Sequence, residues 1–201
     1  MRILTNEDNN RVAAHDIDSV YLKRWSPRSF ANKDVDQPTL NSLFEAARWA
    51  PSAANIQPWQ FIYAKSAEDR ETFLSFIKDG NISWCKHAPV LIAVVSKCNW
   101  PKGNDLNPTH AFDTGTAWGY LALEAARKGL IAHAMGGFNR EKAKQVLLLP
   151  ENYQVHAIVA VGYQGYKESL NEKYHEREIP SNRKAIEEFI YEGKFKSTTQ
   201  E

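Results

Sequence analysis

The sequence feature that most constrains the fold is an apolar run, APVLIAVVS, from Ala88 to Ser96. Its apolar residues do not alternate with polar ones, so a strand formed by this run must be buried on both faces. Such a strand belongs inside a sheet that other elements cover on both sides. The run is also far shorter than the roughly 20 residues that a membrane-spanning helix needs.

Helical and strand patterns alternate along the rest of the chain. A helix is predicted between Pro38 and Pro51 by five apolar residues at helical spacing, namely Leu40, Leu43, Phe44, Ala47 and Ala50. Further helices are expected over 17–23, 67–78, 109–129 and 139–148, and further strands over 60–64, 130–135 and 155–163. Because two helices precede the first strand and a long polar arm follows the last, we expect an α+β fold with α/β-type alternation and a mixed sheet.

The chain has 201 residues, which suits a single domain over 1–201, with a core over about 16–195 and flexible ends. Its 25 Lys and Arg against 24 Asp and Glu give a formal net charge of +1, so no nucleic-acid or membrane partner is expected. The first residues are too polar for a signal peptide, and the two cysteines, Cys85 and Cys98, lack CxxC spacing. We expect a cytoplasmic protein with free thiols.

Common signatures of catalytic and metal sites are absent from the sequence. It contains no GxGxxG, no GxxxxGK and no GxSxG, which disfavours a Rossmann dehydrogenase, a P-loop enzyme and a serine hydrolase. The six histidines are scattered without metal-ligand spacing, so no metal site is expected. Four stretches remain: RWSPRSF, APSAANIQPWQF, AMGGF and SNRKAIEEFI. Each alone is also compatible with an ordinary turn, helix stop or surface arm.

Together, these four stretches resemble the FMN-dependent nitroreductase family, and the resemblance extends from Val20 to Phe195. The order and spacing of the first two stretches are its most specific part. The resemblance implies a mixed four- or five-stranded central sheet flanked by helices, with an extended C-terminal arm. It also implies an intertwined homodimer that binds FMN at the subunit interface.

The first and last of the four stretches, RWSPRSF and SNRKAIEEFI, carry the basic residues that match the family. Arg24, Ser26 and Arg28 match the family's Arg-x-Ser-x-Arg element, whose guanidinium groups meet the flavin phosphate and the pyrimidine edge of the ring. The resemblance makes Arg24 the first candidate for the N1 and O2 side of the flavin, with a phosphate contact as the alternative. Trp25 stands where a second basic residue is common and offers backbone groups or stacking. Arg183 matches the basic position of the arm and completes the phosphate clamp.

The second stretch is expected to reach the flavin held mainly by the other subunit. Pro51 frees backbone groups there, and Ser52 and Asn55 offer side-chain hydrogen bonds to the ribityl chain and the ring edge. Ala53 replaces a serine that is common in the family. Gln57 either assists the flavin or only holds the loop.

The third stretch lies beside the flavin ring in the family. Met135, Gly136 and Gly137 match the segment whose backbone N–H points at flavin N5, and glycine leaves room for that approach. Asn81 is a further candidate for the pyrimidine edge, although local hydrogen bonding is the ordinary role of such a residue.

The function implied by the resemblance is hydride transfer from NADPH or NADH, through flavin N5, to a nitroaromatic, a quinone or a similar electron-poor acceptor. No catalytic acid or nucleophile is expected, because the cofactor carries the chemistry. Trp84, Trp100 and Phe112 could wall the acceptor pocket, with core packing as the alternative for each. Two other functions stay open, namely a non-catalytic flavin sensor or store and a reductive dehalogenase or dehydrogenase of the same fold.

Overall fold

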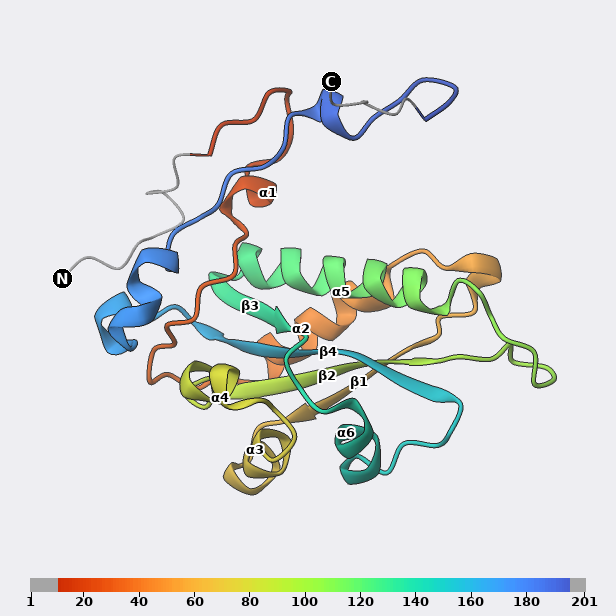
Figure 1. Ribbon diagram of the computed structural model, residues 1–201, viewed down its shortest axis with the longest axis horizontal. Coiled ribbons are helices and arrows are strands. Elements are labelled where there is room, and N and C mark those ends of the chain that lie inside the picture. Colours follow the sequence, from red (N-terminus) through yellow and green to blue (C-terminus); the bar gives the residue numbers. More distant parts are fainter. Residues whose placement is uncertain (1–10, 196–201) are drawn as a thin grey trace, which may run out of the picture.

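The computed structural model describes residues 11–195, so residues 1–10 and 196–201, which belong to the ends expected to be flexible, lie outside the described residues. A four-stranded sheet lies between two layers of helices (Figure 1). The strands are β1 Trp59–Ala64, β2 Val90–Lys97, β3 Leu130–Met135 and β4 Tyr153–Tyr163. The helices are α1 Ser19–Lys23, α2 Gln37–Arg48, α3 Ala67–Leu74, α4 Asp79–Cys85, α5 His110–Arg127 and α6 Arg140–Val146.

The strand order is β1-β2-β4-β3, and each of these neighbouring pairs is antiparallel. The expected α+β fold with helices on both sides of a sheet is confirmed, but the described strands of one chain do not form a mixed sheet. The reason is the position of β4, which lies between β2 and β3 in the sheet. β2 and β3 run in the same direction because α5 connects them as a crossover, and β4 then enters between them and pairs antiparallel with both.

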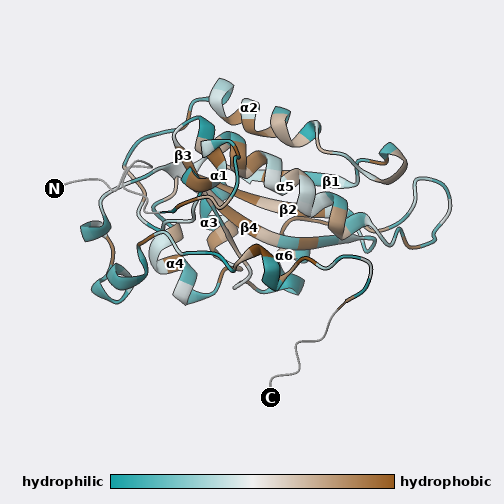
Figure 2. Ribbon diagram, turned by 90° about the horizontal axis from the view of Figure 1, so that it is seen from above, coloured by the Kyte–Doolittle hydropathy of each residue, from teal (hydrophilic) through white to brown (hydrophobic). Residues whose placement is uncertain are grey.

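The apolar run over 88–96 forms most of β2, and its side chains are buried on both faces. Val90, Ile92 and Val94 belong to a core cluster that also holds buried residues of α2 and α5. Leu91, Ala93 and Val95 alternate with them and belong to a second cluster, with buried residues of α3, α4 and α6. Figure 2 shows apolar strands beneath α5 and α2. The prediction of a doubly buried strand is therefore confirmed.

One expected helix is shorter than predicted. The helix expected over 67–78 ends at Leu74, because Phe76 and Ile77 turn to pair with the segment after β3. Ile77 forms a β-bridge with Phe138, and Phe76 O accepts a hydrogen bond of 2.8 Å from Asn139 N. A separate helix, α4, then begins at Asp79 and was not expected.

The chain leaves the sheet after β4 as a long arm with three short 3-10 turns: η2 Lys167–Ser169, η3 Glu172–Arg177 and η4 Ile186–Glu188. The end of the arm runs beside the start of the described chain, away from the sheet (Figure 1). Arg11 Nε donates to Ser181 O at 2.8 Å and joins the two segments. Within residues 11–195, no helix combines the length and the apolar character that crossing a membrane requires.

Candidate functional site

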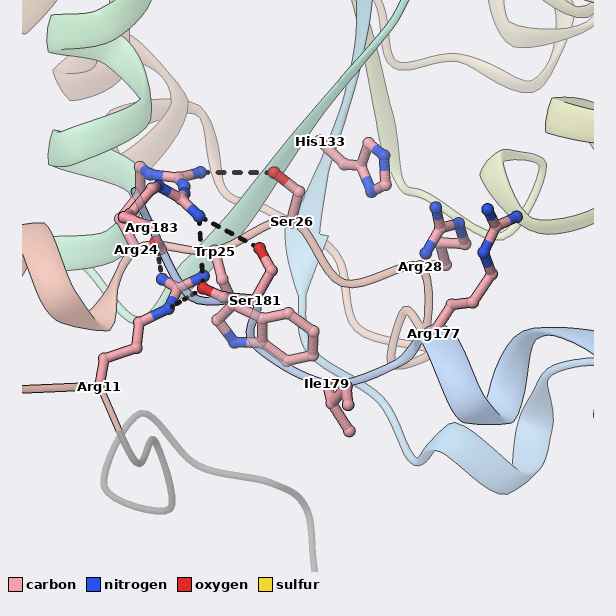
Figure 3. Close-up of a pocket in the computed structure, with 10 residues that line it drawn as sticks. All are labelled: Arg11, Arg24, Trp25, Ser26, Arg28, His133, Arg177, Ile179, Ser181 and Arg183. Carbon is pink, nitrogen blue, oxygen red and sulfur yellow. Dashed lines mark hydrogen bonds between the residues drawn. The ribbon is translucent and has the colours of Figure 1, made fainter. Parts of the chain in front are cut away.

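Five arginines converge on one pocket at the base of the arm, with a cavity volume of about 350 Å³ (Figure 3). The pocket is lined by Arg11, Arg24, Trp25, Ser26, Arg28, His133, Arg177, Ile179, Ser181 and Arg183. These residues come from three parts of the chain: the stretch around α1, strand β3 and the arm. Among these ten described residues there is no Asp or Glu. The pocket is therefore suited to an anion.

The arginine stretch is held against the end of β4 by backbone pairing. Phe30 forms a β-bridge with Gln164, and Ala31 N donates to Tyr163 O at 2.9 Å. Gly165 N donates to Ser29 O at 3.0 Å. A Cβ on Gly165 would lie 2.7 Å from the carbonyl carbon and oxygen of Phe30, so only glycine permits this approach. The sheet thus supports the segment that carries the arginines.

Arg11, Arg24 and Arg183 gather on one side of the pocket, together with Ser26 and Ser181 (Figure 3). A guanidinium nitrogen of Arg24 donates to Ser26 Oγ at 3.3 Å, and one of Arg183 donates to Ser181 Oγ at 3.1 Å. Burial, followed by the nearby charge of Arg183, lowers the pKa of Arg11 and of Arg24. These groups repel one another, and a bound anion would relieve the repulsion.

Arg28 and Arg177 lie next to each other on the other side, with His133 above them in the view of Figure 3. The His133 ring Nδ1 lies 2.9 Å from Pro27 O. Burial lowers the pKa of His133 to about 4, and the charge of Arg28 acts in the same direction against the hydrogen bond to Pro27. His133 is therefore neutral at pH 7, and its Nδ1–H donates to the Pro27 carbonyl.

The loop over 51–57 lies at the opposite end of α5 from this pocket (Figure 1), and none of its residues lines the pocket. Ala53 N donates to the buried carboxylate of Asp113 at 3.2 Å. Gln57 N donates to Ser52 Oγ at 3.0 Å, and Gln57 Nε2 donates to Asn55 Oδ1 at 3.0 Å. Within one chain, Gln57 therefore holds the loop.

This loop also has an unusual backbone. Ala54, Asn55 and Gln57 have φ values of 48°, 54° and 53°, in the left-handed region that favours glycine. An alanine in that region costs about 1–2 kcal/mol, so surrounding contacts must hold the loop in shape. A loop held under strain at an exposed position is a reasonable candidate for a binding role.

Met135, Gly136 and Gly137 follow His133 along and beyond β3, but they do not line the pocket. Met135 is buried, and Gly137 O accepts hydrogen bonds from Lys78 N at 3.0 Å and from Asn81 Nδ2 at 3.2 Å. Asn81, which lies in α4, therefore ties this helix to the segment after β3.

The pocket brings together five of the predicted site residues: Arg24, Trp25, Ser26, Arg28 and Arg183. It adds Arg11, His133, Arg177, Ile179 and Ser181, which sequence reasoning missed. A signal existed for two of them, since His133 shares a strand face with Met135 and Ser181 lies two residues before Arg183. Of the aromatic candidates, Trp84 is buried in the core and Phe112 is exposed, and none of the three lines this pocket.

Comparisons of the sequence and of the structure with known proteins agree with one another. The model of the nitroreductase family matches residues 21–83 and 77–163. A solved structure described as an oxidoreductase containing FMN is 38% identical, with a TM-score of 0.89, and the match covers 94% of this chain and 97% of that one. A curated protein of Ralstonia nicotianae, provisionally named an NADH dehydrogenase/NAD(P)H nitroreductase, is 24% identical over 73% of this chain and 85% of its own length.

Proposed function

The chain belongs to the nitroreductase family and is an oxidoreductase. From this membership, we propose that it binds FMN and passes a hydride from NADPH or NADH to an electron-poor acceptor such as a nitroaromatic or a quinone. The observation that carries the proposal is the pocket, where two separated sequence stretches of the family resemblance supply Arg24, Arg28 and Arg183. A similar protein whose structure contains FMN adds support.

The chemistry of the pocket fits a flavin phosphate. A phosphate ester carries up to two negative charges and needs charged donors to be held in one place. Arg24 and Arg183, with the hydroxyl groups of Ser26 and Ser181, offer such donors on one side of the pocket. A volume of about 350 Å³ also lies in the range of small-molecule pockets.

For Arg24, the division of the pocket favours the phosphate contact over the ring edge. Arg24 lies with Arg11 and Arg183, so it belongs with the phosphate donors (Figure 3). Arg28 lies on the other side and is the better candidate for the pyrimidine edge. When bound, FMN supplies a ring that accepts a hydride and passes it on. The protein contributes positive charge and orientation.

A homodimer would complete the site. The loop over 51–57 and the arginine pocket lie apart within one chain, so this loop could reach a flavin only in a second subunit. Large apolar side chains are exposed at the start of the described chain, on the arm and on α5, among them Val12 (91%), Phe189 (59%) and Phe112 (77%). Such surfaces commonly mark a protein interface.

The proposed function is tested by a visible spectrum of the purified protein with added FMN, followed by anaerobic NADPH and then NADH. Flavin bands that bleach with either nucleotide and return with a quinone or a nitroaromatic are the expected result. Bound flavin that stays oxidised with both nucleotides would instead indicate a non-catalytic flavin protein. Absence of flavin binding would contradict the proposal.

The phosphate clamp is tested separately by single substitutions. Arg183→Ala and Arg24→Ala should each weaken FMN binding by about 1.5–3 kcal/mol, because each removes a charged hydrogen bond. Lys144→Ala is the control, since Lys144 pairs with Glu151 at the α6 end of the molecule and does not line the pocket. The measurement is a fluorescence titration with FMN. Equal affinities in all four proteins would exclude the clamp.

A further inference from the structure

Glu178 is a fully buried acid directly behind the arginine pocket, with an exposed fraction of 0%. It follows the turn η3, and its side chain contacts the arginine stretch about 150 residues away in sequence. Glu178 Oε1 accepts three hydrogen bonds: from Arg28 N at 2.7 Å, from Ser29 N at 2.8 Å and from Ser29 Oγ at 2.9 Å. This oxygen therefore fixes the backbone from which Arg28 projects.

The second carboxylate oxygen has a different neighbour. Glu178 Oε2 is buried, has no hydrogen-bond partner among the described residues, and lies 3.9 Å from a guanidinium nitrogen of Arg28. A buried carboxylate oxygen without a hydrogen bond is costly unless a nearby positive charge compensates it. The nearest compensating charge is Arg28, whose side chain is 23% exposed.

Aromatic rings limit where Arg28 can move. Its guanidinium carbon lies 6.0 Å from the centre of the Trp84 ring and 5.8 Å from that of the Tyr174 ring. These contacts are long for cation–π interactions and leave the carboxylate as the strongest attraction on the guanidinium. Arg28 is thus held from behind by Glu178 while it lines the pocket.

We propose that Glu178 is a positioning residue that directs the Arg28 guanidinium and reduces the positive charge that Arg28 presents to the bound flavin. The inference rests on the proposed function, because it assumes FMN in the arginine pocket. It assigns one task to each carboxylate oxygen: Oε1 holds the backbone, and Oε2 compensates the guanidinium. A purely structural role would require only the hydrogen bonds that Oε1 accepts from the backbone and from Ser29.

Glu178→Gln separates the two tasks. The amide keeps an oxygen that can accept the three hydrogen bonds, but it removes the negative charge next to Arg28. Two-electron-reduced FMN carries more negative charge than oxidised FMN, so an uncompensated Arg28 should favour the reduced form. We expect the ratio of affinities for reduced over oxidised FMN to rise about tenfold, or about 30 mV in a two-electron potential.

The experiment measures the reduction potential of bound FMN in the wild type, in Glu178→Gln and in Glu176→Gln. Glu176 is an exposed acid in the same turn, so its substitution removes an equal charge without touching Arg28 and should leave the potential unchanged. A potential in Glu178→Gln that is unchanged or lower would overturn the proposal. Urea unfolding of both variants shows whether the fold is kept.

A double-mutant cycle tests whether Glu178 acts through Arg28. In an Arg28→Gln background, the shift caused by Glu178→Gln should fall to less than half, because the guanidinium is gone. An equal shift in both backgrounds would overturn the positioning role. If the wild type itself does not bind FMN, the proposed function fails together with this inference. Normal flavin binding with an unmoved potential overturns only the role of Glu178.

Discussion

Arginines placed side by side, with no acid among the residues that line the same pocket, are the main residue-level feature of this protein. The lowered pKa values of Arg11 and Arg24 report burial first and then the repulsion from Arg183. The Arg-x-Ser-x-Arg spacing made Arg24 and Arg28 recognisable in the sequence. Arg11 and Arg177 could not be predicted, because a single basic residue brought in by tertiary structure leaves no local pattern. Glu178 was missed for the same reason, since an acid in a polar arm resembles a surface residue.

The neutral state of His133 predicts a loss of stability in mild acid. Its pKa is about 4 in the folded protein, mainly through burial, against about 6.5 in the unfolded chain. Above pH 6.5 neither state binds the proton, and stability is full. As the pH falls from 6.5 towards 4, the unfolded chain binds a proton that the folded protein does not. Between pH 7 and pH 5 this should lower the free energy of unfolding by about 2 kcal/mol.

The contribution of His133 is isolated by His133→Asn, whose amide nitrogen can replace Nδ1 as the donor to Pro27 O. Urea unfolding at pH 7 and pH 5, at matched flavin occupancy, should show a smaller loss in this variant. His15→Asn serves as the control, because His15 is exposed, and it should behave like the wild type. A loss in His133→Asn as large as in the wild type would contradict the assignment.

At the level of elements, periodicity predicted most of the helices and strands but not their directions. The doubly apolar β2 and the long helix α5 were expected from their patterns. Antiparallel pairing was not, because it depends on β4 entering between β2 and β3. The short helix α4 was missed, since a seven-residue segment with a glycine near its start carries little helical signal.

Gly165 joins two elements, the arginine stretch and the end of β4, and its substitution should affect both stability and binding. A Cβ at this position would meet Phe30 backbone atoms at 2.7 Å, so Gly165→Ala should cost about 1–3 kcal/mol. It should also weaken FMN binding, because Arg28 lies two residues before Phe30. Urea unfolding and flavin titration measure the two effects.

Gly80→Ala provides the matched control. A Cβ there has no heavy atom within 4 Å, and Gly80 lies in a helix, so the change should stabilise the protein by up to about 1 kcal/mol. If both alanine variants showed equal stability and equal flavin affinity, the close approach at Gly165 would have no energetic importance.

At the level of the whole molecule, two groups of predicted site residues, the arginine pocket and the loop over 51–57, lie at opposite ends of α5. The sequence resemblance assigned the loop over 51–57 and the arginine pocket to one flavin. Within one chain, the loop and the pocket lie far from each other (Figure 1). This separation agrees with the expectation from the resemblance that the loop reaches a flavin held mainly by the other subunit. The strained backbone at Ala54 and Asn55 gives this loop a fixed shape before any partner arrives.

A site shared between subunits predicts that two defective chains can complement each other. One variant would lose the pocket through Arg24→Ala and Arg183→Ala, and the other would lose the loop through Ser52→Ala and Asn55→Gly, since glycine suits the φ of 54°. A mixed dimer then carries one intact site and one doubly defective site. When the two chains are coexpressed at equal levels, half of the dimers are mixed, so about one quarter of the sites should bind FMN.

The measurement is the FMN stoichiometry at a concentration that leaves each parent variant almost empty. Coexpression of the double-arginine variant with Arg28→Ala is the control. Both lesions then lie in the same pocket, so every site carries one of them and no recovery is expected. Recovery in the first mixture alone would place the pocket and the loop in different subunits of one site. Equal stoichiometry in the two mixtures would mean that each chain binds flavin without the partner's loop.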